Sequence, residues 1–69
     1  MPNKKLPRIL GKRIKLYRKR MKITQEELAD KLHISRAYMG YIEQGRNTPS
    51  LEVLQKLAKK LKVSMKDFF

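Results

Sequence analysis

Residues 25–44, QEELADKLHISRAYMGYIEQ, decide how this chain folds. Apolar side chains recur at helical spacing on both sides of a break at residues 33–35. Ser35 is a residue type that favours the start of a helix, and Gly45 is one that favours its end. The stretch therefore predicts two helices joined by a three-residue connection, with the second helix over residues 36–44.

The first of these helices carries a clear start signal. Thr24 is followed three residues later by Glu27, which is the spacing of a capping box. In such a box each side chain accepts the backbone N–H of the other residue, so two unpaired donors are satisfied. The residues expected to pack the two helices together are Leu28, Ala29, Leu32, Ile34, Met39 and Ile42.

The second helix has two different faces when its residues are placed at about 100° intervals. Met39 and Ile42 fall on one side and are expected to face the core, with Tyr38 on the flank. The opposite side carries Arg36, Ala37, Gly40, Tyr41 and Gln44. A guanidinium, an amide, a phenol and two small residues are groups suited to base edges and phosphates in a DNA major groove.

The segments on either side of this pair are helical as well. The apolar positions that predict a helix over residues 8–20 are Leu10, Ile14, Tyr17 and Met21. Ser50 begins a helix whose expected inward residues are Leu51, Leu54, Leu57, Ala58 and Leu61. Ser64 and Asp67 have capping-box spacing over a short last helix at residues 65–69.

The predicted fold class is therefore all-α, because no segment shows the alternation of a strand. Short connections favour a compact five-helix domain over residues 9–69. Residues 1–8 contain two prolines and several basic residues but little to bury, so they are expected to form a basic flexible arm. A 69-residue chain has room for one such domain.

The charge of the chain points to a polyanionic partner. The sequence holds 18 Lys or Arg and 6 Asp or Glu, a net charge of +12. Residues 4–22 contain ten basic residues and no acid. A positive excess of this size attracts polyanions by releasing their counterions, and nucleic acid is the commonest such partner.

Composition also excludes several classes of protein. Without cysteine the chain has no disulfide framework and no thiolate ligand, which fits a cytoplasmic protein. No apolar run reaches the ~18 residues of a membrane span. His33 is the only histidine, so a metal site is not expected. No nucleophile–base pair, paired carboxylates or glycine-rich loop is present, so neither an enzyme nor a cofactor is predicted.

Several segments together resemble the phage repressor and Cro-type (XRE-type) helix-turn-helix domain. They are LGKRIKLYRKR (10–20), TQEELADKL (24–32), SRAYMGYIEQG (35–45), NTPSLEVLQKLAKKL (47–61) and VSMKDFF (63–69). The resemblance covers nearly the whole chain in the order and spacing of the family. It implies a five-helix domain that reads operator DNA as a homodimer, with residues 36–44 as the recognition helix.

The resemblance also implies roles for particular residues. The base-reading positions of the family fall on Arg36, Ala37 and Tyr41, and its phosphate contacts fall on Gln25, Tyr38, Arg46 and Asn47. Its structural ion pair falls on Arg18 and Glu43. The chain departs from the family pattern at Lys22, His33 and Lys62, where glycine is usual, and at Gly40, which lies inside the recognition helix.

The function expected from these observations is a sequence-specific, double-stranded DNA-binding transcriptional regulator, with repression as the expected mode. A dimer seam is expected to cover Phe68 and Phe69 at the end of the chain. Two alternatives stay open: an antitoxin-type regulator whose main partner is a protein, and a nucleic-acid binder indifferent to sequence. The chain is either a stand-alone regulator or the DNA-binding part of a longer one.

Overall fold

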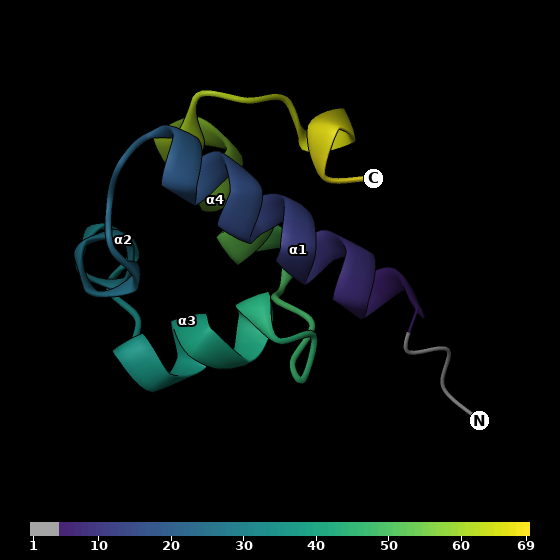
Figure 1. The fold of residues 1–69 in the computed structure, drawn as a ribbon, viewed down its shortest axis with the longest axis horizontal. Helices are drawn as coiled ribbons and strands as arrows, with labels where there is room; N and C mark the ends of the chain where they lie inside the picture. The colour runs from purple at the N-terminus through teal and green to yellow at the C-terminus, as the bar shows by residue number, and fades with distance from the viewer. Residues whose placement is uncertain (1–4) are drawn as a thin grey trace.

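A computed structural model describes residues 5–69, which form four α-helices and a final 3-10 helix (Figure 1). In chain order these are α1 (Lys5–Arg20), α2 (Gln25–Leu32), α3 (Arg36–Glu43), α4 (Leu51–Leu61) and η1 (Met65–Phe68). None of the described residues lies in a strand. The prediction of an all-α fold with five helical elements is confirmed.

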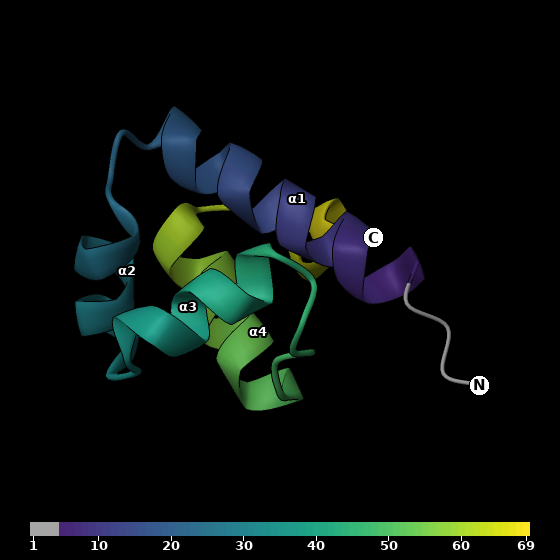
Figure 2. The ribbon, with the colours of Figure 1, turned by 60° about the horizontal axis from the view of Figure 1, so that its bottom comes forward.

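The helices surround one small core. The longest helix, α1, crosses the molecule and contacts α3, α4 and η1, while α2 contacts both α3 and α4 (Figures 1 and 2). The buried apolar residues are Leu10, Ile14, Leu28, Ala29, Leu32, Met39, Ile42, Leu54, Leu57, Ala58, Leu61 and Phe68. Every helix contributes to this cluster, so the domain has a single core.

The capping residues predicted from the sequence are confirmed. The Thr24 hydroxyl accepts the Glu27 N–H at 3.0 Å, and the Glu27 carboxylate accepts the Thr24 N–H at 3.0 Å. Ser35 and Ser50 accept backbone N–H groups at the starts of α3 and α4. The capping box of Ser64 with Asp67 is present as well, but the helix it begins is a 3-10 helix.

The turns that lack glycine close in the left-handed conformation. Lys22, His33 and Lys62 have φ of 58°, 57° and 58°. A residue with a Cβ costs roughly 1–2 kcal/mol in this region. These three helices therefore end in the left-handed conformation that glycine usually adopts, although each of these residues carries a side chain.

Helix α1 begins at Lys5, three residues before the predicted start at Arg8. Pro7 occupies the first turn, where a missing N–H leaves no helical hydrogen bond unmade. Leu6 and Pro7 also line an apolar groove with Leu54, a contact that the local sequence does not reveal. Half of the predicted arm is thus helical, and residues 1–4 of it lie outside the described residues.

Two predictions of apolar burial are wrong, and so is the prediction that Phe68 is available to a dimer seam. Met21 lies beyond the end of α1 and is 36% exposed, because the helical period stops at Arg20. Leu51 is 64% exposed in the first turn of α4, where side chains tilt toward the N-terminus and away from the packed part of the helix. Phe68 is fully buried within one chain, packed beside Tyr17, so it is not available to the predicted dimer seam.

Candidate nucleic-acid interface

The two-faced character predicted for α3 is confirmed. Met39 and Ile42 are 0% and 1% exposed and pack into the core. Arg36, Ala37, Tyr41 and Gln44 are exposed, while Gly40 is half-buried. The helix therefore presents one polar face outward, held in place by its buried apolar face.

That outward face lines a shallow hollow of about 390 Å³. Its lining residues are Gln25, Arg36, Ala37, Gly40, Tyr41 and Gln44. The structure thus brings the three predicted base-reading positions together with Gln25 at the start of α2. No side chain projects from Gly40, and among residues 5–69 the atom outside its own helix that a Cβ built there would meet is the Gln25 Oε1, at 3.8 Å. A ligand could therefore approach the middle of α3 closely.

Gln25 is held by the end of α3. Its Nε2 donates to the Glu43 Oε1 at 3.0 Å. A side-chain amide nitrogen carries two N–H donors, so one stays available to a ligand. The contact ties the start of α2 to the last residue of α3 and positions Gln25 beside the hollow.

Glu43 is also held by Arg18 of α1, as predicted. The Arg18 Nε and Nη2 donate to the two carboxylate oxygens at 2.6 and 3.1 Å. The remaining Arg18 nitrogen, Nη1, donates to the Ile23 carbonyl at 2.8 Å. The positive charge of Arg18 therefore neutralises the carboxylate, and the pair links α1, α3 and the turn before α2.

Gly11 permits this close crossing of α1 and α3. A Cβ at this position would lie 2.5 Å from the Ile42 carbonyl oxygen and 2.7 Å from that of Glu43. Sequence reasoning missed this role, although a glycine inside a helix next to the core residue Leu10 was a usable signal. Gly11 thus determines how closely α3 packs against α1.

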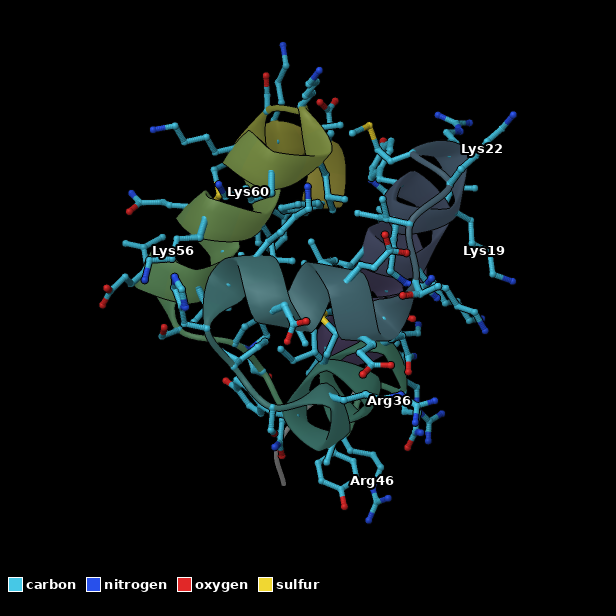
Figure 3. The ribbon with its side chains drawn as sticks, turned by 90° about the vertical axis from the view of Figure 1, so that its left-hand side faces the viewer. Lys19, Lys22, Arg36, Arg46, Lys56 and Lys60 are labelled. Atoms are coloured by element: carbon cyan, nitrogen blue, oxygen red, sulfur yellow. The ribbon has the colours of Figure 1, made fainter. Side chains whose placement is uncertain are left out.

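The loop after α3 carries two predicted phosphate contacts, Arg46 and Asn47, both exposed. The Arg46 guanidinium lies over the Tyr41 ring at 4.7 Å from its centre, a contact not expected from the sequence. Figure 3 shows Arg46 and Arg36 pointing out from the same side of the molecule. Tyr38, the third predicted contact around this helix, is half-buried and packs against the core.

A second shallow hollow, of about 480 Å³, lies beside the first, where α1 ends and α2 begins. Arg36 and Gln25 line both hollows. Lys19 and Lys22 line the second one. The sequence marked Lys22 only as a departure from the family's glycine and gave neither lysine a role in binding, because both sit in a long run of basic residues. Only the fold separates them from their neighbours.

One carboxylate near this surface has a perturbed pKa. The Thr24 backbone N–H, followed by the Thr24 side chain, holds the pKa of Glu27 below its ordinary value of 4.5, and Lys31 adds to the effect.

Within residues 5–69 no helix is long and apolar enough to cross a membrane, and no group of His, Cys, Asp or Glu could hold a metal ion.

A helix pair with a three-residue turn, whose second helix has an exposed polar face, defines a helix-turn-helix DNA-binding domain. A family model described as helix-turn-helix matches residues 14–68. The chain belongs to the XRE-type helix-turn-helix family of DNA-binding transcriptional regulators.

Proteins with similar sequences are named as repressors or transcriptional regulators. The chain is 47% identical to the immunity repressor protein of Bacillus phage phi105 over 49 residues, which cover 71% of this chain and 34% of the repressor. It is 42% identical over 57 residues to an uncharacterized HTH-type transcriptional regulator of Methanocaldococcus jannaschii, covering 83% of this chain and 86% of that protein. The chain thus spans about a third of the phage repressor but most of the archaeal protein.

Solved structures agree with this assignment. The restriction-modification controller protein C.AhdI of Aeromonas hydrophila superposes with a TM-score of 0.85 at 30% identity, covering 91% of this chain and 96% of the controller. The clp gene regulator ClgR of Corynebacterium glutamicum superposes with a TM-score of 0.88 at 30% identity, covering 91% of this chain and 67% of ClgR.

Proposed function

We propose that this regulator is a repressor that binds an operator in double-stranded DNA with α3 in the major groove. The observation that carries the proposal is the hollow on the outward face of α3, where Arg36, Ala37 and Tyr41 lie together beside Gly40. An arginine in this position can pair with guanine, and Ala37 and Tyr41 offer apolar contact to a thymine methyl group.

The proposed phosphate contacts surround this helix. They are Gln25 at the start of α2, Tyr38 on the flank of α3, and Arg46 and Asn47 in the loop that follows. Contacts of this kind set the register of a protein on the duplex without reading its sequence. The proposed activity involves no catalysis and no cofactor, and its proposed location is the cytoplasm.

The proposed assembly is a homodimer, because reading two half-sites requires two recognition helices. Phe68 is unavailable, but Phe69 is 51% exposed and borders an apolar groove. The residues that line this groove are Leu6, Pro7, Leu10, Thr48, Leu54 and Phe69. A second copy seated here would cover apolar surface that a single chain leaves in water, against the repulsion between two chains of charge +12.

Selection of bound duplexes from a random pool tests the proposed function. A repressor of this class should enrich a short two-fold-related sequence and bind it ~10³-fold or more tightly than random DNA. Enrichment of no sequence would favour the sequence-indifferent binder. Binding that appears only with a co-purifying protein would favour the antitoxin-type alternative.

Sedimentation of two matched variants tests the proposed dimer. Leu6 lies in the groove, whereas Leu16 is similarly exposed on the same helix but does not line it. Leu6→Ser should weaken association, and Leu16→Ser should not. A strict monomer both free and on the selected operator would overturn the dimer and leave DNA binding intact.

A further inference from the structure

We infer that Lys19 and Lys22, beside Arg36, form a binding site for a DNA backbone phosphate, and that Lys22 keeps a strained backbone conformation to serve it. The inference rests on the proposed function and extends it to residues that the family resemblance does not assign. The site is the hollow of about 480 Å³ between the end of α1 and the start of α2.

The first support is the charge of this hollow. Of its lining residues, Arg18 is neutralised by the Glu43 carboxylate, and Glu26 is the one acid. Lys19, Lys22 and Arg36 have no ion-pair or hydrogen-bond partner for their side chains among residues 5–69. Three unpaired cations against one carboxylate leave an excess of two positive charges on a concave surface, which favours an anion.

The second support is position. Arg36 and Gln25 line both this hollow and the one on the outward face of α3. Figure 3 shows Lys19 of α1 and Lys22 of the following turn extending on the same flank as Arg36, while Lys56 and Lys60 extend from α4 on the other flank. A duplex seated on α3 would therefore bring one strand of its backbone past Lys19 and Lys22. A backbone phosphate fits this open, shared surface better than an enclosed small anion does.

The third support is the backbone of Lys22. Its φ is 58°, where glycine is relaxed and a side chain is strained. The Lys22 N–H donates to the Lys19 carbonyl and the Ile23 N–H donates to the Arg18 carbonyl, so the turn itself would form equally well with glycine. Strained conformations concentrate at functional sites, and here the strained residue carries its charge into the hollow.

Lys62 is a matched control within the same chain. Its φ is also 58°, and it ends α4 with the same pattern of bonds, from its own N–H to Lys59 and from the Val63 N–H to Ala58. It does not line the hollow. Lys22→Gly and Lys62→Gly therefore remove the same charge and relieve the same backbone strain. They differ in whether the residue lines the hollow.

The experiment measures thermal unfolding and affinity for a random-sequence duplex of about 20 base pairs at several salt concentrations. Both glycine variants should raise Tm by several degrees. Lys22→Gly should also reduce the slope of log affinity against log salt by about one and weaken binding about fivefold to tenfold at 0.1 M salt. Lys62→Gly should leave the slope unchanged. Lys19→Gln should weaken binding as Lys22→Gly does, without a change of backbone strain.

Equal slopes for Lys22→Gly, Lys62→Gly and the unaltered protein would overturn the inference. This outcome is distinct from failure of the proposed function, because phosphate contacts act on any duplex. A protein that shows no preferred sequence but loses slope specifically on Lys22→Gly would lack sequence reading and still possess this phosphate site. Absence of binding to any duplex would overturn both.

Discussion

The guanidinium of Arg18 meets the carboxylate of Glu43 through two parallel hydrogen bonds, of 2.6 and 3.1 Å, between α1 and the last residue of α3. Their side chains are 10% and 2% exposed. The Glu43 carboxylate also accepts a hydrogen bond from Gln25 of α2. One buried carboxylate thus joins the three helices whose relative positions determine how the recognition helix is presented.

We expect Arg18→Met to lower the free energy of unfolding by about 3–5 kcal/mol, because it leaves the Glu43 charge buried and unpaired. Thermal and urea unfolding measure this loss. The exposed pair of Lys56 with Glu52, at 3.5 Å, is the control. Lys56→Met should change stability by less than about 1 kcal/mol. Similar effects of the two substitutions would show that burial does not strengthen the first pair.

Gly11→Ala should destabilise the domain although alanine favours helices. The new Cβ would press on the carbonyl oxygens of Ile42 and Glu43, and overpacking of this kind costs about 1–3 kcal/mol. The gain in helix propensity is only about 1 kcal/mol. Gly40→Ala has the same gain and only one distant neighbour, so it should raise Tm. An increase in Tm for Gly11→Ala would contradict the close crossing of α1 and α3.

Arg36→Ala and Arg46→Ala should weaken DNA binding in different ways. Loss of a base contact at Arg36 should cost about 1–3 kcal/mol on the operator and relax the preference at one base pair, with a much smaller effect on random DNA. Loss of a phosphate contact at Arg46 should weaken both complexes about equally and flatten the salt slope by about one. Affinities for both duplexes at several salt concentrations separate these patterns.

The contact of Arg46 with the Tyr41 ring adds a control to this comparison. Tyr41→Ala removes the ring over which the Arg46 guanidinium lies, so its effect on affinity should not add to that of Arg46→Ala in the double variant.

The prediction for Arg36 has its own contrary outcome. If Arg36→Ala lowers affinity for operator and random DNA in parallel, α3 holds phosphates without reading bases.

Acid should weaken the start of α2. The pKa of Glu27 is lowered in the folded protein, so its stabilising effect is complete above the ordinary value of 4.5 and is lost as pH falls through the lower folded value. The free energy of unfolding should therefore change less between pH 3 and pH 7 for Glu27→Gln than for the unaltered protein. At pH 7, Glu26→Gln removes the same charge from the same turn but no capping bond, so it should lower stability less than Glu27→Gln does.

Much of the fold could be predicted because it depends on local patterns. The capping box of Thr24 with Glu27 and the apolar spacing around Ser35 locate α2 and α3 without reference to the rest of the chain. The outward face of α3 follows from the same spacing, since a helix has one fixed period. The pairing of Arg18 with Glu43 followed from the family resemblance, and the structure confirms it.

The errors came where local patterns end. The burial of Met21 and Leu51 was predicted wrongly because periodicity does not show which turns of a helix meet another element. Phe68 lies in the core and Phe69 at the surface, although they are identical neighbours in the sequence. The difference arises from how the end of the chain docks on α1, where Tyr17 donates to the Asp67 carbonyl of η1 and Arg13 donates to the Phe69 backbone oxygen just after it.

The all-α class, the helix pair of residues 25–44 and the chemical groups along α3 follow from residue order alone, because they depend on spacing along one chain. Which cations lie close together depends on how the helices pack. Lys19 and Lys22 are two among ten basic residues between positions 4 and 22, and they become distinct because the turn after α1 places them beside Arg36. Such a site depends on the distances between side chains of different helices, and these cannot be read from the order of residues.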